Sequence, residues 1–340
     1  MRRLTHCWLA VIFLLTALTG CDKKPAENTT PEIVKVTPFV KEILKNSVQS
    51  VIKTASFPSD LSKVNKILMY VKLECPTGGC GAWDVYANVL ARERTTGTFY
   101  EIARYITPYG RDNSTRERGF VFDVTDFKSV LSGDTEIKLF TEVWTDAGWM
   151  VTVDFDFEMG KPDYTYYSIV PVMQFNQHSL AGIPYGETNS FKTTYNVTIP
   201  ASAKETVLRT IISGWGHATP ADPDGRPCAE WCFRSHKIYI DDVNTFTHAL
   251  TGLGCEANAV PGQAGNWKPD RAGWCPGMEV PVRSNKLADP KAGKTFKFSY
   301  ELQDWTNNFE STADNKHAYY AISTFVVVKA NEPISAATVN

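Results

Sequence analysis

The stretch Met150-Val-Thr-Val-Asp-Phe-Asp-Phe157 decides the fold class of this chain. Apolar and polar residues alternate along it without a break, and a period of two is typical of a β-strand that buries one face. One face would carry Val151, Val153, Phe155 and Phe157, and the other Thr152, Asp154 and Asp156. The stretch therefore predicts a strand whose sheet covers a core on one side.

Similar short runs occur along most of the chain, in two series separated by Gly160-Lys-Pro-Asp163. Helical periodicity is weak and is limited to residues 41–52 and a turn at 124–131. Many short strands with Gly and Pro turns indicate two all-β sandwiches. The expected strands are 66–73, 84–91, 98–106, 119–124, 136–143 and 150–157 in the first series, and 166–175, 206–212, 236–240, 295–302 and 319–329 in the second.

The N-terminus has the pattern of a targeting segment. Met1-Arg-Arg3 is basic, residues 8–18 are apolar but too few to span a bilayer, and Leu18-Thr-Gly-Cys21 matches the bacterial lipoprotein box. We therefore predict a lipoprotein-type signal peptide over residues 1–20, lipidation of Cys21 and a polar tether over residues 21–40. The protein would be exported and lipid-anchored to a bacterial membrane, on the periplasmic face or at the cell surface. An ordinary signal peptide with an incidental cysteine is the alternative.

The rest of the chain is long enough for two domains, which we place at residues 41–162 and 163–340. Charge is nearly balanced, with 35 basic and 37 acidic residues and no basic run, so nothing indicates nucleic-acid binding. The membrane would be reached through the lipid alone. We expect a monomer.

The cysteines indicate disulfides. Of the 8 cysteines, six remain once Cys7 is removed with the signal peptide and Cys21 is lipidated. An even number in an exported chain implies disulfides. Zinc is the alternative for clustered cysteines, but the pairs lie far apart and lack flanking histidines, so we expect no metal. The pairs suggested by spacing are Cys75–Cys80, Cys228–Cys232 and Cys255–Cys275.

Two of these cysteine pairs each accompany an acid and a tryptophan. Trp83 and Asp84 follow the first pair, and Glu230 and Trp231 lie inside the second. A short disulfide before Asp84 would fix where the next strand begins, and so where the carboxylate points. Two such acids suggest a site that holds carboxylates against a sugar or another flat ligand. The alternative is that both pairs are loop staples and both acids are solvated.

Longer strings of unusual composition occur in a set order from about Val64 to the C-terminus. They are Glu74-Cys-Pro…Cys80…Trp83-Asp84…Tyr86-Ala-Asn-Val89, Asp123-Val-Thr-Asp-Phe-Lys-Ser129, Ile212-Ser-Gly-Trp-Gly-His-Ala218, Cys228-Ala-Glu-Trp-Cys-Phe-Arg234 and Asn266-Trp…Pro269-Asp-Arg-Ala-Gly-Trp-Cys-Pro-Gly-Met278. In these strings the chain resembles the bacterial peptide-N-glycosidase F family. The resemblance implies two antiparallel jelly rolls packed side by side, and the same three disulfides.

The resemblance also implies an activity. The family hydrolyses the amide between asparagine and the first N-acetylglucosamine of an N-linked glycan, which releases the glycan and converts the asparagine to aspartate. N-glycosylated proteins or glycopeptides would be the substrates, and no cofactor would be needed. By the family's motif, Asp84 would be the principal catalytic carboxylate, with Glu230 and Glu142 as supporting acids. Because Glu230 comes from the second domain, the site would lie between the two domains.

Aromatic residues in or beside these strings are expected to bind the glycan, because a tryptophan ring matches the flat C–H face of a pyranose. Trp144, Trp215 and Trp231 are expected in the cleft, whereas Trp83 and Trp274 belong either to the cleft or to the core. His217 is also expected at the substrate. Arg271 would donate hydrogen bonds to the substrate, or form a salt bridge with Asp270 as a loop staple.

Two positions depart from the family. Val85 stands where the family has Arg, and Gly110 stands where it has Trp. Both changes remove recognition groups, so a surface lipoprotein that binds glycans with weak or no catalysis is the rival function. The double jelly roll is also used by copper monooxygenases, but the mature histidines include no His-x-His or adjacent pair that would indicate copper.

Overall fold

The computed structural model describes residues 31–175, 183–184, 190–218, 228–304 and 319–340. Contacts group Glu32–Asn340 into one unit. The predicted signal peptide and Cys21 lie outside the described residues. None of the helices in the described ranges has the length and apolar character needed to cross a membrane.

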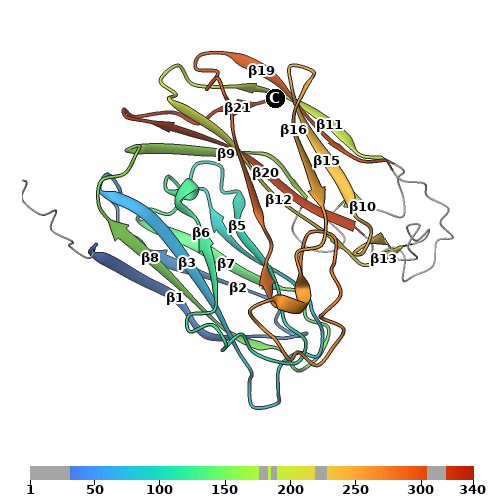
Figure 1. Cartoon of the computed structure of the whole chain (residues 1–340). Coiled ribbons are helices and arrows are strands. Elements are labelled where there is room, and N and C mark those ends of the chain that lie inside the picture. Colours follow the sequence, from blue (N-terminus) through green and yellow to red (C-terminus); the bar gives the residue numbers. More distant parts are fainter. Residues whose placement is uncertain (1–30, 176–182, 185–189, 219–227, 305–318) are drawn as a thin grey trace, which may run out of the picture. The chain divides into compact units, whose positions relative to one another are not determined.

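The first half of the chain forms a sandwich of two antiparallel sheets (Figure 1). Its strands are β1 (Ile33–Leu44), β2 (Ser50–Ser56), β3 (Val64–Glu74), β4 (Tyr86–Arg92), β5 (Phe99–Ile106), β6 (Phe120–Asp123), β7 (Asp134–Thr141) and β8 (Trp149–Met159), with the short helix η1 (Thr125–Phe127) after β6. One sheet has the order β1-β8-β3-β6, and the other runs β5-β4-β7-β2. One sheet thus contains the first, eighth, third and sixth strands of the chain, and the other, read from β2, contains the second, seventh, fourth and fifth. Eight strands in this order form a jelly roll.

The second half repeats this arrangement. Its elements are β9 (Tyr166–Phe175), β10 (Ile183–Pro184), β11 (Lys192–Thr198), β12 (Glu205–Trp215), β13 (His217–Ala218), β14 (Cys228–Ala229), β15 (Arg234–Ile240), β16 (Val243–Leu250), η3 (Cys255–Ala257), β17 (Met278–Glu279), β18 (Val282–Lys286), β19 (Thr295–Leu302), β20 (Tyr319–Ala330) and β21 (Thr338–Val339). One sheet contains β9-β20-β12-β18, and the other contains β16-β15-β19-β11. The prediction of an all-β chain with two jelly rolls is confirmed.

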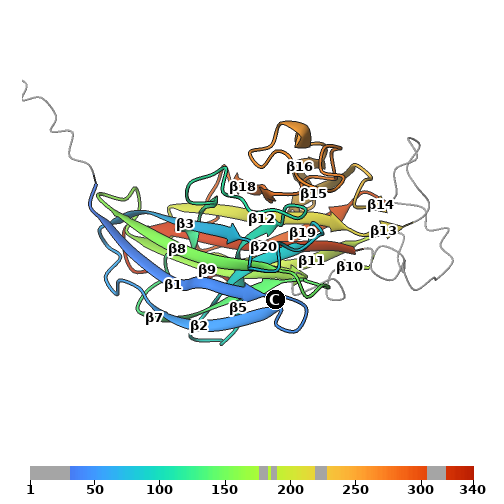
Figure 2. The same ribbon diagram turned by 90° about the horizontal axis from the view of Figure 1, so that it is seen from below.

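Strand β8 shows why the alternation decides the fold. It lies between β1 and β3 (Figure 2). Its apolar positions 151, 153, 155 and 157 are fully buried in the core of the first sandwich. Asp156, on the opposite face, is also buried, but it forms an ion pair with Arg118. Alternation therefore places Val151, Val153, Phe155 and Phe157 in one core, where each buried side chain contributes roughly 1.5–3 kcal/mol. Met150, on the opposite face, is only half-buried.

Two features join the halves. Strand β17, from the second half, pairs with the end of β5, where Met278 is the partner of Ile106. The second feature is Arg104 of β5, which is fully buried. It donates hydrogen bonds across to the second half, to the Ser213 hydroxyl (2.9 Å) and the Ala321 carbonyl (2.7 Å). We propose the domain boundary at residues 162–163, because β8 ends at 159 and β9 begins at 166.

Two N-terminal predictions are wrong. The tether cannot extend through residue 40, because residues 33–40 belong to β1, and residues 41–52 contain the end of β1 and the start of β2 rather than helix. Register shifts on either side of Phe39 interrupt the alternation of β1 and hide its strand period. The apolar residues that imitate helical spacing, Val40 and Ile43, are exposed.

Candidate active site

Asp84 is held just before β4 by its neighbours in the chain. The Val85 N–H donates to the Thr107 hydroxyl (2.9 Å), and the same hydroxyl donates to the Trp83 carbonyl (3.1 Å). Upstream, Gly81 packs so closely on Trp149 that a Cβ there would come within 2.3 Å of the indole ring. The backbone around Asp84 is therefore fixed on both sides, and its carboxylate is nearly buried.

Glu230 is held in a similar way in the second half. It lies inside the Cys228–Cys232 disulfide, its N–H donates to the Gly216 carbonyl (3.0 Å), and its own carbonyl accepts from the Ala272 N–H (2.8 Å). Its side chain is also nearly buried. All three disulfides suggested by spacing are present.

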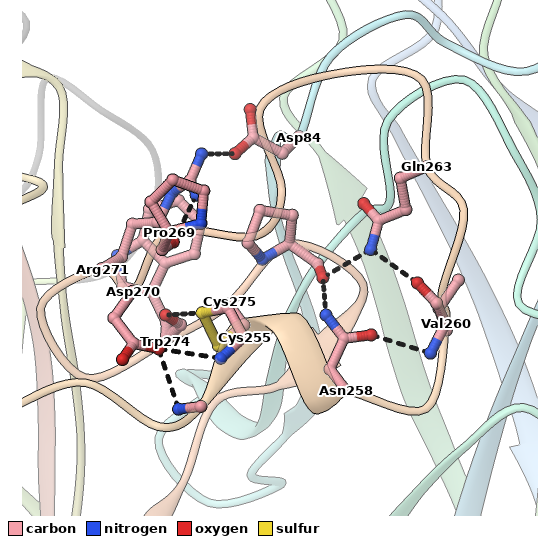
Figure 3. Close-up of a disulfide and its surroundings, with 12 residues drawn as sticks. Asp84, Cys255, Asn258, Val260, Gln263, Pro269, Asp270, Arg271, Trp274 and Cys275 are labelled. Carbon is pink, nitrogen blue, oxygen red and sulfur yellow. Dashed lines mark hydrogen bonds and ion pairs between the residues drawn. A yellow bond between two sulfur atoms is a disulfide. The ribbon is translucent and has the colours of Figure 1, made fainter.

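A loop closed by the Cys255–Cys275 disulfide brings Arg271 to Asp84 (Figure 3). The Asp270 carboxylate accepts from the Gly254 and Cys255 N–H groups, both at 2.8 Å, which anchors the end of the loop. Gln263 accepts from the Tyr109 N–H (2.9 Å) and so ties the loop to the first half. The sulfurs of the disulfide and Asp270 have the spacing of metal ligands, but each sulfur is already bonded to the other.

Arg271 bridges the two acids. Its Nη2 lies 3.5 Å from Asp84 Oδ2, and its Nε lies 3.3 Å from Glu230 Oε1. Its guanidinium also donates to the Pro269 carbonyl (2.7 Å), the Asn266 carbonyl (2.5 Å) and the Tyr109 hydroxyl (3.2 Å). The predicted salt bridge to Asp270 is therefore wrong. Because Arg271 is 0% exposed, its guanidinium holds the two acids together and does not reach the surface, where a sugar hydroxyl would accept a hydrogen bond.

Burial controls the protonation of Asp84. It raises the pKa of this carboxyl to about 8, and the negative charge of Glu230 acts in the same direction. The Arg271 charge and a hydrogen bond from Tyr109 oppose the increase. Burial, followed by the Asp84 charge, raises the pKa of Tyr109 as well, so this hydroxyl keeps its proton and serves as a donor. Asp84 is therefore a carboxylic acid that retains its proton at neutral pH.

His217 contacts Glu230 from the exposed side. Its Nε2 lies 3.3 Å from Glu230 Oε2 and 3.1 Å from the Trp231 indole Nε1. One nitrogen cannot serve both partners at once. A neutral ring with its proton on Nδ1 accepts at Nε2 from the indole, whereas a doubly protonated ring donates from Nε2 to the carboxylate. The hydrogen bond to Glu230 raises the pKa of His217, which favours the second state as pH falls.

Glu142 follows β7 and is nearly buried. Its backbone N–H donates to the Tyr86 carbonyl (2.9 Å), which places it beside the start of β4. Its carboxylate accepts from the Tyr319 hydroxyl of the second half at 3.5 Å. The described contacts of Glu142 thus place it beside the other half of the chain, as they do for Asp84.

The five tryptophans divide into surface and core. Trp83 is 55% exposed and Trp144 is 49% exposed, whereas Trp274 is fully buried. Trp274 stacks on Trp215 at 5.1 Å and donates to the Gly214 carbonyl, so of the two places expected for it, the cleft or the core, it occupies the core. Trp215 is mostly buried and lies 6.4 Å from Trp144. Trp231 covers the guanidinium of Arg271 at 4.2 Å.

The two departures from the family have different surroundings. Val85 is 1% exposed and belongs to the core of the first sandwich, so it is no part of a binding surface. Gly110 has a positive φ of 61°, a conformation that disfavours any other residue, and a Cβ there would lie 3.2 Å from Ala264.

Sequence reasoning missed two tyrosines. Tyr109, beside Asp84 and Arg271, directly precedes Gly110, and of the two residues only Gly110 differs from the family in a way that the sequence reveals. Tyr319 begins a strand far along the chain, and no local pattern connects it with Glu142.

The fold and the site together define a class: a double jelly roll in which one acid from each half, Asp84 and Glu230, meets the other around a buried arginine. Two family models match this chain, the N-terminal part of peptide-N-glycosidase F over residues 81–157 and its C-terminal part over residues 185–327. The peptide-N(4)-(N-acetyl-beta-D-glucosaminyl)asparagine amidase F of Elizabethkingia miricola is 48% identical over 317 residues, which cover 93% of this chain and 88% of the relative. This chain belongs to the peptide-N-glycosidase F family.

Solved structures agree. A crystal structure of peptide-N(4)-(N-acetyl-beta-D-glucosaminyl)asparagine amidase has a TM-score of 0.85 and 48% identity, with 91% of this chain and 100% of the other covered. PNGF-II has a TM-score of 0.68 at 15% identity, covering 88% of this chain and 66% of the other, and this similarity shows the fold alone.

Proposed function

We propose that this chain is an amidase that hydrolyses the bond between asparagine and the first N-acetylglucosamine of an N-linked glycan. It releases the glycan from N-glycosylated proteins or glycopeptides and leaves aspartate in place of asparagine. The meeting of Asp84 and Glu230 around Arg271, in a chain 48% identical to such an amidase, is the observation that supports this function.

The reaction needs two proton movements. A water oxygen bonds to the amide carbon and gives up a proton, the C–N bond breaks, and the nitrogen leaves as a glycosylamine after gaining a proton. Groups that donate or accept a proton near pH 7 serve both steps. A carboxyl whose pKa is raised can keep its proton until the amide needs it.

Asp84 fits the role of the proton donor. With a pKa of about 8 it is protonated at neutral pH, and we assign it to hydrogen-bond the scissile amide directly. Glu230 would share or relay a proton through water, with His217 as its exposed partner. For Glu142, the contact with Tyr319 favours positioning of the substrate over holding Glu230. The exposed rings of Trp83 and Trp144 are the surfaces we assign to the sugar.

We also propose export. Disulfides persist in oxidising compartments outside the cytosol, and three disulfides lie around the proposed site. Lipidation of Cys21 is a further proposal, which metabolic labelling with a fatty-acid analogue would test by comparing wild type with Cys21→Ser.

Mass spectrometry of a defined glycopeptide tests the reaction. The expected product is the full-length peptide with Asp in place of Asn, carrying one heavy oxygen when the reaction is run in H₂¹⁸O. A peptide that keeps one N-acetylglucosamine on Asn would indicate an endoglycosidase instead. Binding of the glycopeptide without release would favour a glycan-binding protein.

Substitution of the acids tests their ranking. Asp84→Asn should lower kcat by roughly 10²–10⁴, the range that a proton-transfer group supplies. Glu230→Gln should be almost as severe, and Glu142→Gln should be milder and act mainly on KM. An active Asp84→Asn variant beside an inactive Glu142→Gln variant would overturn the assignment of roles while leaving the reaction intact.

A further inference from the structure

A cavity of about 550 Å³ lies away from the acids, between the two jelly rolls. One wall comes from β3, β6 and η1 of the first half, and the other from β12, β18, β20 and the segment before β18. Strands β6 and β18 are each the edge strand of their sheet, so the cavity lies where two sheet edges face each other. Its size is within the range of small-molecule sites, roughly 300–1,000 Å³.

The charges that line the cavity are balanced. It has three cations and three carboxylates, namely Lys66, Arg209, Lys329, Asp123, Asp126 and Glu279. They are paired with opposite charges: Asp126 lies 3.3 Å from Arg209 and 3.4 Å from Lys329. An anion or cation entering the cavity would therefore meet a neutralised surface, and a neutral ligand is favoured.

The cavity offers hydrogen-bonding groups beside apolar surface. Arg209 is nearly buried, its two described hydrogen bonds are long at 3.2 and 3.3 Å, and its Nε has no acceptor among the described residues. Oxygen acceptors of a ligand would use the remaining guanidinium donors. Val121 and Val282 contribute apolar surface, and the Tyr167 ring also lines the cavity. Hydroxyl groups next to C–H faces are the matching chemistry, and a sugar ring has both.

An added peptide strand fits less well. An edge strand binds a peptide through its outward N–H and C=O groups. On β6 the Val121 N–H is already bonded to the Glu279 carboxylate at 2.8 Å, and Glu279 is itself paired with Arg116. This contact blocks the edge on the side that faces the cavity.

We propose that this cavity is a carbohydrate-binding site for a neutral saccharide, separate from the acids. The proposal does not depend on the amidase reaction, because none of its lining residues is an acid assigned to that reaction. On a glycoprotein substrate, such a site would hold sugar at a distance from the scissile bond.

Amide chemical shifts of the ¹⁵N-labelled protein test the proposal, with methyl α-D-mannopyranoside and N,N′-diacetylchitobiose as probes. At least one probe should produce saturable shifts at residues 121–126 and 279–284. Ser284→Trp places a large side chain on the exposed strand that lines the cavity and should weaken this binding at least tenfold. Val121→Trp tests the opposite wall in the same way, and Thr245→Trp, on exposed strand β16, is the matched control.

Saturable shifts in wild type that both cavity variants lose and the control keeps would support the proposal. The absence of saturable shifts at these amides would overturn it, as would shifts caused by inorganic phosphate or by a blocked trialanine peptide in place of the sugars. Glycopeptide release is measured on the same samples. If the protein releases the glycan but no sugar binds in the cavity, the cavity proposal is contradicted and the amidase function is not. If sugar binds in the cavity but no glycan is released, the amidase function is contradicted and the cavity proposal is not.

Discussion

At the scale of single residues, Arg271 connects the two acids. It is fully buried, and carbonyls of its own disulfide-closed loop hold its guanidinium. Its positive charge lowers the pKa of Asp84 against the larger effect of burial. The arginine therefore sets both the position of the acids and the pH range in which Asp84 is protonated.

Replacement of this arginine should change the pH profile as well as the rate. In wild type, activity should fall above about pH 8, where Asp84 loses its proton. Arg271→Gln removes the charge that lowers the pKa of Asp84, so the alkaline decline should move to higher pH while kcat falls on the order of 10². The measurement is the rate of glycopeptide release against pH. Lys268→Gln, an exposed change in the same loop, should leave the profile unchanged, and an unshifted decline in Arg271→Gln would contradict this role.

Val85 illustrates a difference from the family that the structure places in the core. Introducing the family's arginine by Val85→Arg would bury a guanidinium among apolar side chains, so we expect a loss of several kcal/mol in the free energy of unfolding and no gain in activity. Urea unfolding and glycopeptide assays measure both effects. Val243→Arg, at a residue 65% exposed, is the control. Faster glycan release by Val85→Arg would show that the side chain reaches the substrate.

At the scale of elements, the edge strands were the hardest to predict. Strands β1, β2, β16 and β18 lie at sheet edges, and none was expected from the sequence. β16 is exposed along most of its length, and no residue of β18 is fully buried. A strand that buries little needs few apolar residues, so its alternation is weak. Inner strand β19, by contrast, has the predicted bounds. So does β9, an edge strand that still buries Ile169, Val172 and Met173 and therefore has a stronger apolar pattern.

Inner strand β15 contains a buried histidine that should control acid stability. The ring nitrogen Nδ1 of His236 lies 2.7 Å from the Tyr300 hydroxyl, and burial, followed by the nearby Arg283 and His248, lowers the pKa of His236 to about 2. The unfolded chain binds a proton at this residue below about pH 6.5, and the folded chain does not. Its contribution to stability is therefore full above that pH and is lost as pH falls toward 2.

Substitution of His236 tests this contribution. His236→Asn keeps a hydrogen-bonding group near Nδ1 but cannot titrate, so the decline of the free energy of unfolding below about pH 6.5 should be shallower than in wild type. Denaturant unfolding at a series of pH values measures the slope. Equal slopes in the two proteins would show that other groups cause the acid sensitivity.

At the scale of the whole molecule, a buried ion pair joins the two jelly rolls. Glu101 and Arg104 are both fully buried, with Oε2 and Nη2 at 2.7 Å, and the arginine also bonds to Ser213 and to the Ala321 carbonyl in the second half. Because the proposed site takes acids from both halves, this network helps to keep them in register.

Removing one member of this ion pair should lower the free energy of unfolding. Arg104→Met leaves Glu101 as an uncompensated buried charge, and we expect a loss of about 3–5 kcal/mol in the free energy of unfolding. The double variant Glu101→Gln/Arg104→Met should lose less than the sum of the two single variants. Arg92→Met breaks the exposed pair with Glu136 on neighbouring strands and should cost less than about 1 kcal/mol. Strict additivity of the two buried changes would contradict the coupling.

The sequence by itself determined the all-β class, most inner strands, the three disulfides and the family. These depend on local information: a period of two marks a strand wherever one face is buried, and short cysteine spacings bring their own partners within reach. Asp84 and Glu230 could be selected because each lies next to such a disulfide in a string that resembles the family.

The tertiary structure alone decided burial and the contacts between distant segments. It placed Val85 and Trp274 in the core and turned Arg271 from a substrate-binding candidate into a buried bridge between acids. It also brought Tyr109 to Asp84 and opened a cavity between two sheet edges. No local pattern contains this information, because Glu230 and Arg271, whose charges shift the pKa of Asp84, lie more than a hundred residues away along the chain.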